Sequence, residues 1–187
     1  MRADLKEMVI QVDELDVWHL RETIQLCESL NTSHWQHTHA PFADLDMENH
    51  EYVEALSDQN FRTAGDVHYI WQLGLWRLQA IFEGLIDQHL LRDSRTHGLR
   101  RKLKRLADLG FTLSPNERRE LHEWADLRNA LSHRPVYAAS ITQQVYRDDL
   151  AELADLYAGL IERWRGERAA MTPAQGTPER DQEYGGC

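Results

Sequence analysis

Cysteine is scarce in this sequence and long apolar runs are missing, and both absences restrict the class of protein. The chain has 187 residues and two cysteines. Cys27 lies in a helix-like pattern and Cys187 in a polar tail, so a disulfide framework is not expected. No apolar run is long enough to cross a bilayer, and residues 1–14 lack the apolar core of a signal peptide. We therefore expect a cytoplasmic protein without a membrane partner.

Strand-forming patterns are also absent. No segment alternates apolar and polar residues over a sustained stretch, and Val, Ile and Thr are few, so a β-sheet is not expected. With 42% hydrophobic and 28% charged residues, the chain suits a single globular domain, which we place at residues 1–165. We predict an all-α fold, an antiparallel helical bundle of four main helices plus short connecting helices. Residues 166–187, rich in Pro, Gly and mixed charge, are predicted to be a disordered tail.

Apolar periodicity places the long helices along the chain. Spacings of three and four predict a first helix over residues 4–30 and a final helix around residues 150–164. Residues 31–60 are weakly patterned and predict a long connection with one short helix near residues 48–56. The next helix is apolar on both sides, so we expect it to be central, and its Gly74 indicates close contact with another helix. Its seven-residue series is Ala64, Trp71, Leu78 and Leu85.

A short basic helix and a longer helix follow, and capping residues mark their ends. Gly110 is placed to end the basic helix. Ser114 is expected to be the N-cap of the next helix, with Pro115 at its first position and Glu117 at its third. This helix, named here the motif helix, is predicted to extend over residues 115–132.

Three side chains at the end of the motif helix point to phosphodiester chemistry. Arg128 can hold a phosphate and stabilise the charge that develops in the transition state. His133 can serve as general acid or base, since imidazole titrates near neutral pH, and Asn129 can orient either group. RNA supplies its own nucleophile, the 2'-hydroxyl, so this chemistry requires no metal or cofactor. The alternative is structural: Arg128 pairs with a carboxylate of another helix, and His133 belongs to a C-terminal cap.

Helical geometry limits what one chain can do with these residues. Arg128 projects into the apolar arc of the motif helix, where a guanidinium needs a polar partner. Asn129 and His133 share an adjoining polar seam with His122, which we expect to contact substrate. Arg128 and His133 lie about 140° apart on an ideal helix. Either the helix distorts near Pro135 or a second chain completes the site, and we favour a homodimer.

The segment 126–133 resembles the signature of the HEPN superfamily, in which Arg is followed after four to six residues by His. Arg128, Asn129 and His133 match this signature with a gap of four residues, and the order of helices over about residues 61–165 is similar. The resemblance implies a metal-independent endoribonuclease whose cleft forms between two chains. It also implies attack by the 2'-hydroxyl of RNA, which leaves a cyclic phosphate and a 5'-hydroxyl.

The same resemblance implies a biological setting. Such nucleases occur in toxin–antitoxin and anti-phage defence systems, so an antitoxin or regulatory protein is an expected partner. Pro135 stands where some toxin members carry a tyrosine that their antitoxin modifies, and the nearest tyrosine is Tyr137, so we do not expect that regulation. Other members of the superfamily are non-catalytic helical binding modules, and this remains the alternative function.

One segment is basic although the chain as a whole is acidic. The net charge of −10 argues against general coating of nucleic acid, yet residues 94–107 contain basic residues and no acid. We expect this basic segment to contact the RNA backbone; the alternative is a solvated helix face paired with acidic neighbours. The expected substrate-binding residues here are Arg100, Arg101, Lys102, Lys104 and Arg105.

A group of histidines between the first two long helices raises a metal-binding alternative. His34, His37 and His39 could supply ligands, but cysteine is absent nearby and their spacing fits no closed zinc pattern. We predict a polar loop at this place and no bound metal.

Overall fold

The computed structural model describes residues 15–43, 48–91, 96–133 and 144–171. These residues form five α-helices and no strand, which confirms the all-α prediction. A 3-10 turn, η1 (Ala40–Phe42), and a π-helical segment, η2 (Ile86–Leu91), accompany them. None of the described helices is both long and apolar enough to span a membrane. The α-helices are α2 (Trp18–His39), α3 (His50–Leu85), α4 (Leu99–Asp108), α5 (Pro115–His133) and α6 (Arg147–Met171).

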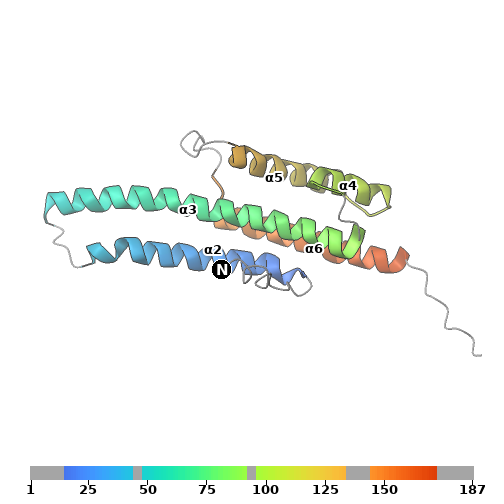
Figure 1. Cartoon of the computed structure of the whole chain (residues 1–187), viewed down its shortest axis with the longest axis horizontal. Helices are drawn as coiled ribbons and strands as arrows, with labels where there is room; N and C mark the ends of the chain where they lie inside the picture. Colours follow the sequence, from blue (N-terminus) through green and yellow to red (C-terminus); the bar gives the residue numbers. More distant parts are fainter. Residues whose placement is uncertain (1–14, 44–47, 92–95, 134–143, 172–187) are drawn as a thin grey trace, which may run out of the picture.

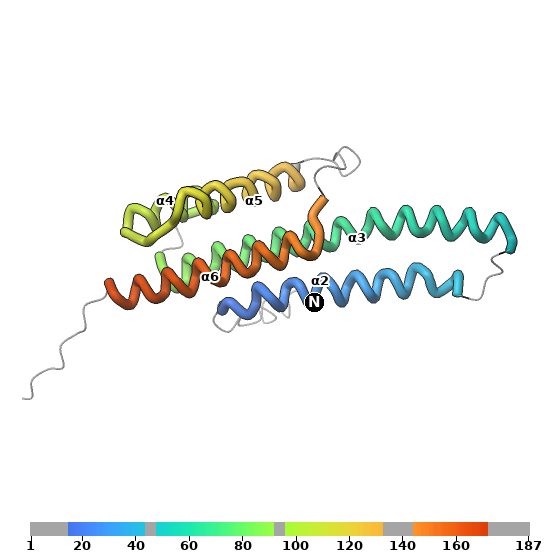
Figure 2. Tube along the Cα trace, turned by 180° about the vertical axis from the view of Figure 1, so that it is seen from behind, coloured from blue at the N-terminus to red at the C-terminus, as the bar shows by residue number. Residues whose placement is uncertain are grey.

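The longest helix, α3, is at the centre of the bundle. Figure 1 shows α2 running antiparallel along one side of α3, and the hairpin of α4 and α5 on the other side. Seen from behind in Figure 2, α6 lies along α3. α3 contacts α2, α5 and α6, which agrees with the apolar character expected on both of its sides.

The core is built mainly from α3 and α6. Phe82 of α3 stacks on Tyr157 of α6 with ring centroids 3.9 Å apart, and both side chains are fully buried. Gly74 permits the close approach of neighbouring helices that its place in the sequence predicts. A Cβ at this position would lie 2.8 Å from Cys27 Sγ and 2.8 Å from Leu150 Cδ1, closer than packed atoms allow.

The prediction of a long connection over residues 31–60 is wrong. α2 continues to His39 and α3 begins at His50, where the side chain of Asn49 accepts a hydrogen bond from the Glu51 amide at 3.0 Å. Figures 1 and 2 show this hairpin extending past the ends of α5 and α6. Most side chains of its outer part are exposed. Because these turns bury no continuous face, they carry no apolar periodicity to detect.

The predicted start of the tail is also wrong. α6 continues through Gly166 to Met171, so residues 166–171 are helical. Arg168 donates a hydrogen bond to the Leu90 carbonyl, and Arg165 forms an ion pair with Asp16 at 2.9 Å. These contacts with η2 and with the segment before α2 hold the last turns of α6. The rest of the predicted tail and the first part of the predicted N-terminal helix lie outside the described residues.

Candidate functional site

The helix that carries the motif, α5, begins at the cap predicted from the sequence. The Ser114 hydroxyl accepts a hydrogen bond from the Glu117 amide at 3.2 Å, and the Glu117 carboxylate accepts one from the Ser114 amide at 2.8 Å. This reciprocal pair is a capping box. Pro115 occupies the first helical position, and Gly110, with φ of 91°, follows the end of α4. The predicted end of α4 and the predicted start of α5 are confirmed, and α5 ends one residue later than predicted.

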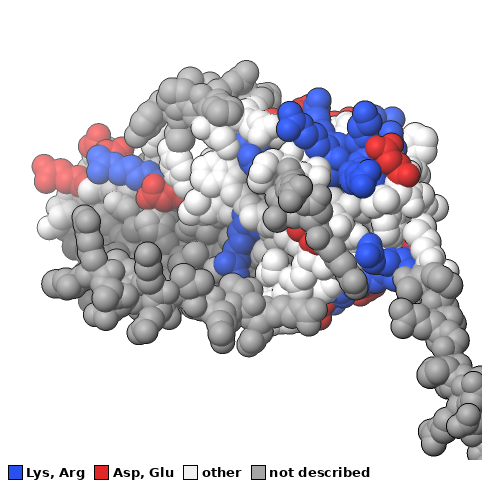
Figure 3. All heavy atoms as spheres, turned by 45° about the vertical axis from the view of Figure 1, so that its right-hand side comes forward, with Lys and Arg blue, Asp and Glu red and all other residues white. Residues whose placement is uncertain are grey.

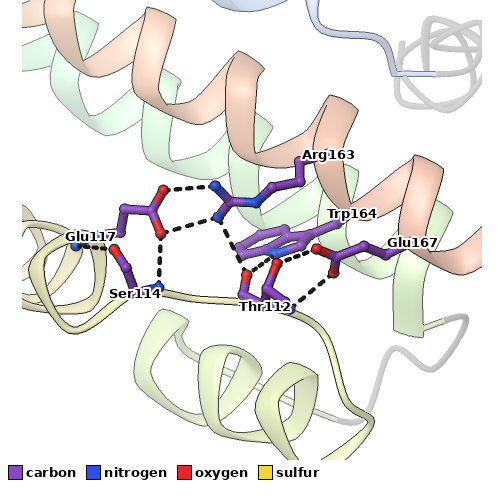
Figure 4. Close-up of polar contacts among 6 residues, drawn as sticks. All are labelled: Thr112, Ser114, Glu117, Arg163, Trp164 and Glu167. Carbon is purple, nitrogen blue, oxygen red and sulfur yellow. Dashed lines mark hydrogen bonds and ion pairs between the residues drawn. The ribbon is translucent and has the colours of Figure 1, made fainter.

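Contacts with α6 fix the start of α5 (Figure 4). The Arg163 guanidinium donates to both oxygens of Glu117 at 2.9 and 3.0 Å. The Trp164 indole donates to the Thr112 carbonyl at 2.6 Å, and Glu167 accepts from the Thr112 amide at 2.9 Å. The hydrogen bonds from Arg163 are the main reason why the pKa of Glu117 is lowered to about 2. Glu117 is therefore ionised at neutral pH, and the ion pair fixes the start of α5 on the bundle.

Arg128 is held by amide groups. Its Nε donates to Gln79 Oε1 on α3 at 3.2 Å, and its Nη1 donates to Asn129 Oδ1 at 3.1 Å. The side chain is half-buried beside buried Leu121 and Leu131, which fits the expectation that Arg128 needs a polar partner. Within the described part of the chain, no carboxylate forms an ion pair with Arg128. Among these residues, the guanidinium is thus held in position by neutral amides and by no carboxylate.

Arg128 and Asn129 line an open groove of about 260 Å³ between α3, α4 and α5. The N-terminus of α4 adjoins this groove, and Gly98, with φ of 85°, offers no side-chain cap to the first amides of the helix. Arg101 lines the groove as well. Three arginines, Arg100, Arg101 and Arg128, and a helix N-terminus around one groove favour an anion such as a phosphate. The remaining lining residues are Gln79, Glu83, His97, Leu99 and Ala125.

The basic residues of α4 have different surroundings. Arg100 donates to both oxygens of Asp126 at 2.7 and 2.8 Å, so its charge is partly compensated. Lys102 is only 5% exposed, and the phosphate contact expected for it does not fit this position. Arg101, Lys104 and Arg105 are exposed, and Figure 3 shows lysine and arginine side chains gathered over the α4–α5 end of the molecule.

Of the two histidines expected at the site, only His122 can be placed, and it does not line this groove. His133 is the last residue of α5, and its side chain lies outside the described residues. His122 is half-buried and lines a separate surface depression with Arg118 and Arg119. The structure therefore brings Arg128, Asn129, Arg100 and Arg101 to one groove, and places His122 elsewhere.

The histidines considered for metal binding belong to a helix and not to the predicted loop. His34 Nε2 lies 3.0 Å from Asp66 Oδ2 and His39 Nε2 lies 2.6 Å from Asn60 Oδ1, so both connect α2 to α3. His37 is exposed. In the described ranges, no three His, Cys, Asp or Glu side chains are grouped so that they could hold a metal ion.

A set of buried and half-buried polar residues next to Arg128 was not predicted. Gln79 and Glu83 lie four residues apart on α3, and Gln79 Nε2 donates to Glu83 Oε1 at 3.1 Å. Lys102 Nζ lies 3.2 Å from Glu83 Oε2 and 2.7 Å from Asp87 Oδ2. We name these four residues the Gln79–Lys102 network. Its signal in the sequence is a pair of polar residues four apart, Gln79 and Glu83, in the part of α3 that carries the buried residues Leu75, Leu78 and Phe82.

No family model, curated protein or solved structure matches this chain. The HEPN resemblance therefore rests on the motif residues themselves.

Proposed function

We propose that this protein is a metal-independent endoribonuclease of the HEPN type that acts as a homodimer. The observation that carries the proposal is the state of Arg128. It lines an open groove beside the α4 N-terminus, is held by two amides, and has no carboxylate partner among the described residues. An uncompensated guanidinium in such a groove is suited to bind a phosphate and the charge of a phosphoryl transition state.

The proposed reaction is transesterification within RNA. The 2'-oxygen attacks the adjacent phosphorus, a 2',3'-cyclic phosphate forms, and the bond from phosphorus to the 5'-oxygen breaks. A base removes the proton of the 2'-hydroxyl, and an acid protonates the leaving 5'-oxygen. His133 is assigned one of these proton transfers, because imidazole changes protonation near neutral pH. Arg128 binds the non-bridging oxygens, and Asn129 holds the guanidinium through its side-chain oxygen at 3.1 Å.

The proposed dimer would supply the second half of the site. On a regular helix Arg128 and His133 are about 140° apart, so one chain does not readily direct both at the same phosphate. Leu73 and Trp76 of α3 are 54% and 37% exposed, and Trp76 is three residues before Gln79, which lines the groove. Two exposed apolar side chains one turn apart at this place support contact with a second copy.

In the same proposal, Arg101 contacts the RNA backbone at the groove that it lines, and Lys104 and Arg105 contact it outside the groove. They are exposed, and the described residues contain no ion-pair partner for them. A role in toxin–antitoxin or defence systems, with a regulatory protein as partner, is the setting that the HEPN resemblance adds to this proposal.

The proposal is tested by RNA cleavage in the presence of a metal chelator. We expect wild-type protein to cleave and to leave cyclic phosphate and 5'-hydroxyl ends. We expect Arg128→Ala to lower kcat about 100-fold or more, because a donor to the transition-state charge is lost. A similar or larger loss is expected for His133→Ala.

Arg119→Ala is the matched control. Arg119 is an exposed arginine of the same helix, 3.8 Å from Glu123 and outside the groove, so its loss should leave cleavage unchanged. Cleavage by His133→Ala at the wild-type rate would refute the mechanism. RNA binding without cleavage by the wild-type protein would favour the non-catalytic binding module.

A further inference from the structure

We infer that Gln79, Glu83 and Lys102 are positioning residues that hold Arg128 in the groove and keep its charge available to an anion. The contact between Gln79 and Arg128 does not depend on any activity of the protein and can be tested without RNA. Its consequence for RNA cleavage rests on the proposed function. None of the three residues needs to touch substrate, because each acts through the next one along the chain of hydrogen bonds.

Lys102 anchors the network. Its ammonium group donates to Asp87 Oδ2 at 2.7 Å and to the Glu83 carbonyl at 3.2 Å, and it forms an ion pair with Glu83 Oε2 at 3.2 Å. The side chain of Lys102 is 6% exposed and that of Glu83 is 15% exposed. A buried cation held by two hydrogen bonds and an ion pair has one strongly preferred position. Lys102 therefore fixes the carboxylate of Glu83.

Glu83 in turn fixes the orientation of the Gln79 side chain. The carboxylate of Glu83 can only accept a hydrogen bond, so the NH₂ group of Gln79 must face it, at 3.1 Å. The Nε–H of Arg128 can only donate, so the carbonyl oxygen of Gln79 must face Arg128, at 3.2 Å. Glu83 and Arg128 therefore favour the same orientation of the Gln79 amide. Since Gln79 is 3% exposed, water competes little for either contact.

The neutral amide at position 79 has a specific consequence for charge. A carboxylate at this distance would form an ion pair with Arg128 and compensate its charge, as Asp126 does for the neighbouring Arg100 at 2.7 Å. Gln79 provides a comparable hydrogen bond to Nε and brings no negative charge. The carboxylate of Glu83 is one residue further along the chain of contacts and is already bound to Lys102. Among the described residues no carboxylate therefore pairs directly with Arg128, whose guanidinium lines the groove.

The surroundings strengthen these contacts. Tyr157 of α6 is fully buried, and burial is the main reason why the pKa of its phenol is raised, with a further contribution from the negative charge of Glu83. The network therefore borders an interior of low polarity, where hydrogen bonds to charged groups are stronger than in water.

The first experiment measures the contact directly, without RNA. In nuclear magnetic resonance spectra of arginine side chains, the Nε–H of Arg128, assigned with Arg128→Lys, should exchange slowly with solvent because it is bonded to Gln79. Gln79→Met keeps the length of the side chain and removes both polar groups, and should increase this exchange rate at least tenfold. Gln72→Met, two turns earlier on α3 and partly exposed, is the matched control and should leave the rate unchanged.

The second experiment is a double-mutant cycle on kcat/KM for RNA cleavage. Gln79→Met should lower kcat/KM about tenfold in the wild-type background. It should have no further effect in the Arg128→Ala background, because a positioning residue acts only through the group it positions. A residue that merely supports the fold would lower kcat/KM in both backgrounds. If Gln79→Met does not fold, Gln79→Leu replaces it in the same cycle.

These two measurements separate the possible failures. An unchanged Nε–H exchange rate in the Gln79 variant would overturn the inference, and so would equal losses of kcat/KM in the two backgrounds. A wild-type protein that does not cleave RNA would refute the proposed function, while the exchange measurement would still decide whether Gln79 holds Arg128.

Discussion

The ion pair between Glu117 and Arg163 allows a quantitative prediction about how α5 is held on the bundle. Glu117→Gln removes the charge and leaves a side chain that can still accept the hydrogen bond from the Ser114 amide in the capping box. A pKa lowered from 4.5 to about 2 corresponds to about 3 kcal/mol of stabilisation at pH 7. The Glu117 and Arg163 side chains are 23% and 40% exposed. Solvent screening reduces the expected loss for Glu117→Gln to about 1–2 kcal/mol.

The pH dependence gives the sharper test. Because the folded-state pKa of Glu117 is depressed, the stabilisation is fully present above pH 4.5 and is lost as the pH falls toward about 2. Urea unfolding at pH 7 and at pH 3 should therefore show a smaller difference between wild type and Glu117→Gln at the lower pH. Glu123→Gln is the control, since the pair of Glu123 with Arg119 is 69% exposed on both sides; we expect it to change stability by less than about 0.5 kcal/mol. Equal losses for the two variants, or a loss for Glu117→Gln that does not depend on pH, would refute the argument.

Three further predictions concern the dimer, the core and the RNA contact. If Arg128 of one chain acts with His133 of the other, mixing the inactive Arg128→Ala and His133→Ala proteins should restore about a quarter of the wild-type cleavage rate. The reason is that half of the dimers are then mixed, and each mixed dimer has one intact site of two. If the dimers exchange chains and no cleavage returns, both residues of a site belong to one chain. Gly74→Ala should lower the free energy of unfolding, measured in urea, by about 1–3 kcal/mol, because its Cβ would lie 2.8 Å from two side-chain atoms. Gly65→Ala is the control: its Cβ would meet nothing within 4 Å, so it should not destabilise the protein. Arg101→Ala should reduce the slope of log binding constant against log salt for single-stranded RNA by about 0.7, and an unchanged slope would exclude a phosphate contact at this residue.

The features of this fold that follow from neighbouring residues could be predicted from the sequence. The capping box of Ser114 and Glu117 needs only four consecutive residues, and Gly110 ends its helix by its own backbone conformation. The central position of α3 follows from apolar residues on both of its sides. In each case the residues that cause the structure lie within the same helix or turn, so the local sequence pattern is sufficient to predict it.

The features that depend on distant residues could not be predicted. Arg163 is 46 residues from Glu117 and Gln79 is 49 residues from Arg128. Many polar residues of this chain could have formed such pairs, and helical periodicity gives no information on which side chains of two helices meet. The outer part of the α2–α3 hairpin escaped prediction for another reason, because it is exposed and polar contacts such as that between His34 and Asp66 hold it together.

The partner of Arg128 on the facing helix distinguishes the two interpretations of the motif better than the motif itself. Had residue 79 been a carboxylate, Arg128 would be one half of a structural ion pair, and the groove would have lost its central charge. Gln79 leaves that charge in place, but a buried amide needs partners of its own. Glu83, whose side chain is only 15% exposed, accepts from that NH₂ group and pairs in turn with Lys102. The contact with Arg128 thus accounts for the spacing of Gln79 and Glu83 on α3 and for one buried lysine in a basic segment.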